Sequence, residues 1–374
     1  MNKNKIIWTV VIIVVIVGAL IYANTGERKN LSDTYTIGAV ETLTGNVAYI
    51  GVSTKQGLEI AKEEIALKYP DLKLNIVHED SLFTPQGGIN AYNKLKTSDH
   101  IDALVTQASN VSIALLPLAK QDNIIHFGVS TLANGFTSPN DLSYRLTPKA
   151  DIEAVPVIAY MQAHKLTKLA ILNMNNEIGT SLVDSLKKEA AAKGIAIVLH
   201  ETYPADATDF KTQLIKVKQL NPEVVYLASL APHTAQILKQ SDELRFKPTF
   251  ISYRATEDPV LVKNAGVLAE GMLYTSAFDI ENNDEAHQSF VQKYEEKYAE
   301  KPNGYAAEAY EATRLIAETF VKCGKDTTCA ATYLNSVKNR PSVFGNLSFD
   351  ENGDVIYPFF LKTVKDGKFV RFTE

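Results

Sequence analysis

Short apolar stretches alternate with amphipathic stretches along most of this chain. Strands are expected at 35–40, 72–80, 102–107 and 124–129, and again at 168–173, 195–201, 224–229 and 248–252. Strands that alternate with helices at this spacing indicate βαβ units and parallel sheets. Nearly continuous apolar strands such as VVYLA are typical of sheets covered on both faces. Because the two sets are separated near 146–151, we predict an α/β fold of two doubly wound, Rossmann-like lobes.

Amphipathic stretches supply the helices between these strands. They are expected at 50–68, 85–97, 111–121, from 179 onward, at 209–220 and up to 244. The last third of the chain departs from the alternation, with helices expected at 284–299, 306–321 and 328–338 and strands at 344–350 and 355–364. These pieces cannot form a third core, so we expect them to return to the two earlier sheets. Both lobes would then be discontinuous, with several chain crossings forming a hinge.

The N-terminus predicts one membrane helix. Lys3 and Lys5 precede a run without charges, 6–23, that would span ~27 Å as a helix, close to the ~30 Å core of a bilayer. The lysines should stay in the cytoplasm, which places the rest of the chain outside it. An uncleaved signal anchor and a cleaved signal peptide both fit, and Ile21 at the minus-three position favours the anchor. Residues 24–34 are polar and indicate a linker.

Charge and motifs argue against several classes of function. The net charge is −5 and no basic stripe is present, so nucleic-acid binding is not expected. The sequence lacks G-x-S-x-G, H-E-x-x-H, a phosphate-binding P-loop and a G-x-G-x-x-G turn, so we expect neither an enzyme nor a nucleotide cofactor. His78, beside Glu79 and Asp80, comes closest to a metal cluster, but a structural role is favoured there and no metal site is expected.

The chain contains two cysteines, Cys323 and Cys329. Two cysteines are too few for a usual four-ligand zinc site. In an exported protein a local disulfide that closes a helix-helix turn is favoured, with a pair of free thiols as the alternative.

Small hydroxyl side chains follow three of the predicted strands: Thr44, Ser109, Ser130 and Thr131. Ligands of open α/β sheets bind beyond the carboxyl ends of the strands, where helix N-termini offer free N–H groups. Each hydroxyl could instead cap the helix that follows it. Their recurrence at successive strand ends favours a binding site.

Four segments carry a family resemblance: TLTGNVAYIG (42–51), LAEGML (268–273), KYAEKPNGYAAEAYEA (297–312) and FGNLSFDENGD (344–354). With them, nearly all of 35–374 resembles the branched-chain amino-acid (Leu/Ile/Val)-binding family, periplasmic receptors of ABC importers with the type I binding-protein fold. The resemblance implies a lobe I of 35–149 plus 278–352 and a lobe II of 150–277 plus 353–374. It also implies a small-molecule ligand and an ABC permease as partners, and we expect a monomer.

By position, the resemblance puts Ser109, Ser130 and Thr131 at the ligand's carboxylate. Thr44 lies in the first of these turns. Ile50 and Ile178 stand where aromatic residues often wall the family's pocket, while Tyr305 keeps a ring. Leu132 replaces a threonine that usually helps to hold the carboxylate.

Arg254 stands where the family has the acidic residue that pairs with an amino acid's ammonium group. Like charges at ~4 Å cost on the order of 4 kcal/mol at an effective dielectric near 20, about a thousandfold in affinity. We therefore expect a small anionic or neutral polar ligand with an apolar body, such as a carboxylate held by Arg254. The alternative is that Arg254 pairs with a carboxylate of the protein, Glu257 or Asp80.

These observations predict an extracytoplasmic solute-binding protein of an ABC importer, held at the cytoplasmic membrane through residues 6–23. A ligand-sensing receptor that signals through a membrane partner is the alternative, because the same two lobes would serve either role.

Overall fold

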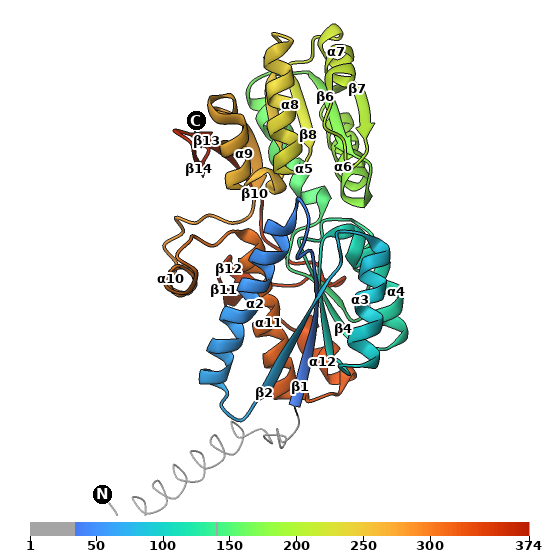
Figure 1. The fold of residues 1–374 in the computed structure, drawn as a ribbon, viewed down its shortest axis with the longest axis vertical. Coiled ribbons are helices and arrows are strands. Elements are labelled where there is room, and N and C mark those ends of the chain that lie inside the picture. The colour runs from blue at the N-terminus through green and yellow to red at the C-terminus, as the bar shows by residue number, and fades with distance from the viewer. Residues whose placement is uncertain (1–33, 140, 374) are drawn as a thin grey trace, which may run out of the picture.

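The computed structural model describes residues 34–139 and 141–373, which form two α/β lobes placed end to end along the long axis of the molecule (Figure 1). The two-lobe fold predicted from the alternation is confirmed. The predicted membrane helix (6–23) lies outside the described residues, as does the linker (24–34) except Thr34, which opens the first strand. Among the described residues, no helix combines the length and the apolar character needed to cross a bilayer.

Lobe I is built on a parallel five-stranded sheet with the order β2-β1-β3-β4-β5. Its strands are β1 (Thr34–Glu41), β2 (Lys73–Asp80), β3 (Ala103–Gln107), β4 (Ile125–Val129) and β5 (Ser143–Arg145). This strand order, with a reversal next to β1, is that of a doubly wound sheet. The fully buried β3 and β4 explain the nearly continuous apolar runs seen in the sequence.

Helices cover both faces of this sheet (Figure 1). On one face lie α2 (Ala48–Lys68) and α11 (Gly304–Cys323), and on the other α3 (Pro85–Thr97) and α4 (Ser109–Gln121). α2 and α11 pack so closely that a Cβ at Gly57 would lie 2.1 Å from the carbonyl oxygen of Ala306. The late segment that contains α11 is therefore an integral part of lobe I.

Lobe II is built on a seven-stranded sheet with the order β14-β13-β10-β9-β8-β6-β7. Its parallel strands are β6 (Lys168–Met174), β7 (Ala196–Tyr203), β8 (Val224–Ala228), β9 (Thr249–Ser252) and β10 (Leu273–Ser276). Two antiparallel strands, β13 (Phe360–Lys365) and β14 (Lys368–Arg371), complete it. Its helices are α5 (Ala150–Ala163), α6 (Glu177–Ala192), α7 (Lys211–Gln219), α8 (Ala231–Glu243) and α9 (Pro259–Ala265).

The remaining elements are short or lie at the edges. They are α10 (Glu285–Tyr298), α12 (Thr327–Asn335), β11 (Arg340–Ser342), β12 (Gly345–Leu347) and the 3₁₀ turns η1 (Arg254–Thr256) and η2 (Gly266–Ala269). The chain passes from one sheet to the other after β5, after β10 and again before β13. The boundaries proposed for the two lobes stay a prediction.

The prediction that both C-terminal strands complete the main sheets was partly wrong. The end of the 355–364 stretch forms β13 and joins the sheet of lobe II, as predicted. The 344–350 stretch does not complete a main sheet, because β12 pairs with β11 in a separate hairpin. The Ser342 hydroxyl donates to the Gly345 carbonyl and closes the turn between these short strands. This turn favours pairing of β12 with β11 over pairing with a distant sheet.

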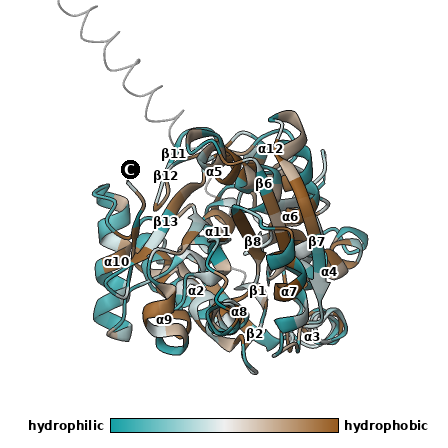
Figure 2. Ribbon diagram, turned by 90° about the horizontal axis from the view of Figure 1, so that it is seen from above, coloured by the Kyte–Doolittle hydropathy of each residue, from teal (hydrophilic) through white to brown (hydrophobic). Residues whose placement is uncertain are grey.

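Figure 2 shows the hydrophobic strands β6 and β8 lying inside a shell of more hydrophilic helices and loops. Buried apolar residues form one large cluster around the sheet of lobe II and two clusters on the faces of the lobe I sheet. A sheet buried on both faces is what the helices of a doubly wound fold provide.

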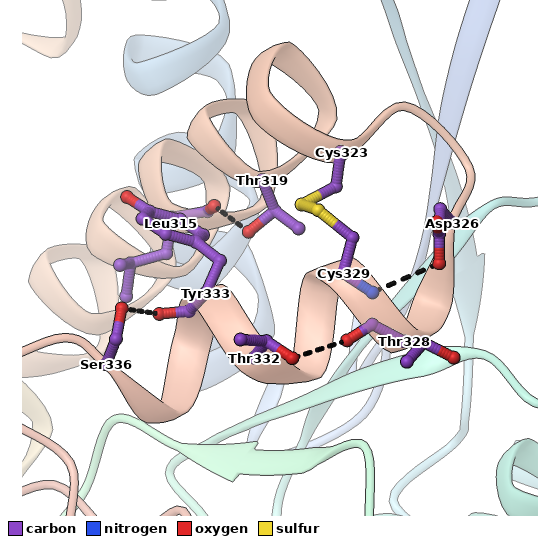
Figure 3. The surroundings of a disulfide bond; sticks show 9 residues. All are labelled: Leu315, Thr319, Cys323, Asp326, Thr328, Cys329, Thr332, Tyr333 and Ser336. Atoms are coloured by element: carbon purple, nitrogen blue, oxygen red, sulfur yellow. Dashed lines mark hydrogen bonds between the residues drawn. A yellow bond between two sulfur atoms is a disulfide. The ribbon is translucent and has the colours of Figure 1, made fainter. Parts of the chain in front are cut away.

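The predicted disulfide is present and joins the end of α11 to α12 (Figure 3). The Cα atoms of Cys323 and Cys329 are 5.5 Å apart. The Asp326 side chain accepts a hydrogen bond from the Cys329 backbone N–H at 3.0 Å and caps α12. The bond therefore fixes a helix-helix turn within lobe I.

Candidate ligand-binding site

The carboxyl ends of the strands of the two lobes face each other across the region between them (Figure 1). Ile50 and Leu132, on loops and helices of lobe I, belong to the same cluster of buried residues as Ile178 and Tyr253 of lobe II. Tyr305, at the start of α11, belongs to it as well. The structure thus brings together three of the predicted site residues, Ile50, Ile178 and Tyr305, in one apolar contact between the lobes.

Ser109 holds the turn that follows β4. Its hydroxyl oxygen accepts hydrogen bonds from the backbone N–H groups of Leu132 and Ala133, at 3.1 and 3.2 Å. Thr131 is fully buried, and its hydroxyl donates to the Val129 carbonyl and lies 2.7 Å from that of Ser112. These two residues therefore shape the turn of lobe I that faces lobe II.

None of the predicted hydroxyls caps a following helix. The N-cap residues of α2 and α4 are Val47 and Ala108, which make no side-chain cap. Thr44 is exposed, and its hydroxyl donates to the Asp80 carboxylate at 2.5 Å. Thr44 therefore lies outside the buried contact, and it joins the ends of β1 and β2 instead.

Arg254 crosses from lobe II to lobe I. Its guanidinium forms a buried ion pair with Glu308 of α11 and donates to the Thr147 hydroxyl at 3.2 Å. It also lies over the ring of Tyr305, 4.7 Å from the centroid. Arg254 thus has a carboxylate of the protein as its partner.

The partners suggested from the sequence were wrong. Glu257 pairs with Lys362, and Asp80 receives the Thr44 hydroxyl and backbone N–H groups. Neither side chain forms an ion pair with Arg254. The guanidinium pairs with Glu308 of α11 instead, which is itself buried, and a buried charge requires a paired one.

The electrostatics of this contact follow from burial. Burial lowers the pKa of Arg254, but the Glu308 carboxylate and the stacked Tyr305 raise it above its usual range. Burial also raises the pKa of the Tyr305 hydroxyl. Both groups therefore keep their protons at neutral pH, and Arg254 remains a cation.

A second buried acid, Glu153, contacts the backbone of Arg254. Glu153 is fully buried, and its carboxylate accepts the Thr275 hydroxyl and the backbone N–H of Arg254, the latter at 3.3 Å. Burial raises its pKa to about 7, although Thr275 and Arg254 act in the opposite direction. Glu153 is therefore near its titration point at neutral pH.

Sequence reasoning found Arg254 and missed Glu308, its partner. Glu308 follows Tyr305 by three residues, so the two share a face of α11. Two acids on the alanine-rich stretch AAEAYEA, Glu308 and Glu311, were an available signal of buried charge. Tyr49 was missed as well, and its hydroxyl donates to the Ala255 carbonyl of lobe II at 3.3 Å.

A cavity of about 360 Å³ opens beside this contact. Lobe I contributes Asn46, Val47 and Phe83 to its wall, and lobe II contributes Met174, Leu230 and His233 among others. Val47, Phe83, Met174 and Leu230 also belong to the buried interlobe cluster or pack against it. Its size is within the usual range for small-molecule sites.

The family model described as "Periplasmic binding protein" matches residues 34–368. The chain belongs to this family of binding proteins. One relative of this binding protein is Leu/Ile/Val-binding protein homolog 2 of Brucella abortus, 27% identical over 347 residues, which are 90% of this chain and 92% of the relative.

Solved structures share the fold. The leucine-binding protein LivK of Thermotoga maritima superposes with a TM-score of 0.85 at 19% identity, over 91% of this binding protein and 98% of LivK. A solute-binding protein of R. palustris in complex with benzoate gives 0.83 at 20% identity, over 91% and 95%. LivJ of Streptococcus pneumoniae in complex with isoleucine gives 0.82 at 20%, over 90% and 98%. These relatives are solute-binding proteins rather than enzymes.

Proposed function

We propose that this protein is the extracytoplasmic receptor of an ABC importer and binds a small organic solute between its lobes. The solute has an apolar body, packed against Ile50, Leu132 and Ile178, and a polar or anionic head that lies beside the Tyr305 hydroxyl. Residues 6–23 hold the receptor at the cytoplasmic membrane.

One observation carries the proposal of a polar head. The Tyr305 hydroxyl is buried in the interlobe cluster and has no hydrogen-bond partner among the described residues. Such a group costs about 1–3 kcal/mol until a partner satisfies it. A solute bound between the lobes would supply that partner, so its binding would favour the closed arrangement.

An α-amino acid is disfavoured by the charges at this place. Glu308 already receives Arg254, the Thr147 hydroxyl and a backbone N–H, so its charge is compensated within the protein. Because Arg254 and Glu308 compensate each other, a ligand ammonium would lose its hydration there without gaining a free counter-charge. The names of relatives include both amino-acid and benzoate binders, so the fold itself accommodates either class.

The test is mass spectrometry of the small molecules released when the purified protein is denatured, followed by calorimetry of each compound with the refolded or washed protein. We expect a compound with an apolar body and a head other than an α-amino-acid group. Tight binding of leucine by the wild type would contradict the proposal. A gene for a sensor kinase next to this one, rather than one for a permease, would support the alternative role as a sensor.

A further inference from the structure

The carboxylate of Glu308 is held by donors from three separate segments. The backbone N–H of Ser130, on the turn after β4, donates to Oε2 at 2.7 Å, and the Thr147 hydroxyl donates to the same oxygen at 2.6 Å. Arg254, from lobe II, pairs with Oε1. Glu308 is 1% exposed, so these donors define a closed site for one carboxylate.

The site is built as a receptor for an anion. Ser130 adopts a left-handed backbone conformation, with φ at 51°, and its N–H meets the carboxylate. A backbone N–H, a hydroxyl and a guanidinium that converge on one carboxylate form charge-assisted hydrogen bonds, the strong class for such groups. Two of these donors lie on lobe I or the crossing after β5, and the third lies on lobe II, so the site forms only where the lobes meet.

We propose that Glu308 determines the charge of the solute: it fills the carboxylate position of the interlobe site with the protein's own side chain, so that the receptor admits a solute with an uncharged polar head and rejects a carboxylate. This inference rests on the proposed function and narrows its ligand class.

Two physical effects act against a solute carboxylate. It would have to displace Glu308, which is tethered beside its donors and therefore competes at a high effective concentration. If it stayed next to the Glu308–Arg254 pair instead, it would lose its hydration without gaining a counter-charge, because the guanidinium is already paired. An uncharged head, such as a hydroxyl or an amide, meets neither penalty and can hydrogen-bond to Tyr305.

The first test needs no knowledge of the solute. Glu308→Ala removes the side-chain carboxylate and leaves its donors in place, so that acetate can occupy the vacated position. In thermal melts of the full chain in detergent, we expect the variant's Tm to be lower than that of the wild type and to rise saturably with acetate. The wild-type Tm should not respond to acetate, and acetamide should not replace acetate in the variant.

The matched control is the double variant Glu308→Ala/Arg254→Met, which lacks the guanidinium and should lose the response to acetate. If Glu308→Ala does not fold, Glu308→Ser serves in its place, because it also vacates the carboxylate position, with formate as the smaller probe. Equal stabilisation of the wild type and the variant by acetate would overturn the proposal, because Arg254 would then be open to solute carboxylates. A variant indifferent to acetate, or as responsive to acetamide, would overturn it too.

The second test uses the solute that the purified protein releases. An uncharged head group supports the role of Glu308, and a free carboxylate on that solute overturns it. If the protein releases no solute and binds none in a screen, the proposed function fails, while the acetate experiment still decides whether Glu308 occupies a carboxylate site.

Discussion

Two buried arginines, Arg145 and Arg254, use their charge differently. Arg145 is fully buried, forms an ion pair with Asp354 at 2.6 Å and donates to the carbonyls of Thr131 and Ala133 at 3.2 and 2.9 Å. Thr131 and Ala133 lie on the turn after β4, and Asp354 forms a β-bridge with Arg145 at the edge of the lobe I sheet, although the predicted boundaries begin the last segment of lobe II at residue 353. Arg254 belongs to lobe II, and its carboxylate partner, Glu308, belongs to lobe I.

The two ion pairs differ in the motion that would expose their charges to water. Neither Arg145 nor Asp354 can be hydrated again without disrupting the turn that carries Thr131, because their contacts are part of the folded lobe. Glu308 and Arg254 can both be hydrated if the lobes move apart. An ion pair inside a lobe should therefore contribute to the free energy of unfolding. An ion pair between the lobes should instead contribute to the free energy of opening.

The largest effect is expected for Arg145→Met. The substitution removes the buried cation from Asp354 and leaves it only the Thr137 hydroxyl and the more exposed Lys149 as partners among the described residues. Loss of one member of a buried ion pair costs about 3–5 kcal/mol of unfolding free energy. Urea unfolding followed by circular dichroism measures this change. The matched control is Lys149→Met, because Lys149 reaches the same Asp354 from a more exposed position at 3.3 Å and should cost less than about 1 kcal/mol. Equal losses in the two variants would contradict the argument.

A second within-lobe cation should make stability depend on pH. His78 lies between Glu41 and Glu59, at 2.7 and 2.9 Å. Burial lowers its pKa, but the hydrogen bonds that it donates to the two carboxylates raise the pKa to about 9. Because this pKa is above the unfolded value of about 6.5, the stabilisation is complete below pH ~6.5 and is lost as the pH rises through ~9, on the order of 3 kcal/mol. Chemical denaturation at several pH values checks this.

The control for that pH dependence is His78→Gln, which has no charge to lose over this range. The slope between pH 6.5 and 9 should be smaller in the variant, without a change in the distance between the lobes. A slope of the same size in both proteins would assign the effect to other groups.

The disulfide is a covalent constraint inside lobe I, so its removal should affect unfolding and not the opening of the lobes. Replacing both Cys323 and Cys329 by serine should lower the unfolding free energy by about 2 kcal/mol, because the closed loop is short. Denaturant titration measures the loss, and X-ray scattering should find the radius of gyration unchanged. An increase in the radius of gyration would mean that this turn also affects the separation of the lobes.

The smallest loss of stability is expected for Arg254→Met, although the residue is almost as deeply buried as Arg145. Opening lets water reach Glu308, so the cost approaches that of an exposed pair, about 1 kcal/mol. The radius of gyration from scattering should increase instead. Arg254→Lys is the matched control, since it keeps the charge and should stay closer to the wild type. A loss as large as that of Arg145→Met with no expansion would refute the distinction between the two arginines.

Strong patterns in the sequence predicted most of the fold. The helix expected at 85–97 coincides with α3, and the strand expected at 224–229 is β8 with one residue fewer. The helix α5 was missed, because its apolar residues lie on most of its sides and give no amphipathic period. β5 and β14 are too short to show a pattern of their own.

The candidate site was predicted less completely. Arg254 stood out because the resemblance implies an acid at its position, but no local pattern connects it to Glu308, which lies 54 residues away. Thr44 was expected at the site only because it follows the first strand in the sequence. In the structure its hydroxyl donates to Asp80 instead. Contacts between distant segments depend on how the lobes meet, which the sequence of either segment does not contain.

The two strands that complete lobe II, β13 and β14, come last in the chain. Until they have joined the sheet, β10 is its outermost parallel strand, with its backbone groups free to pair with another chain. A chain cut short before residue 360 would keep that exposed edge permanently. Premature termination should therefore produce an aggregating fragment rather than a receptor with one weakened lobe.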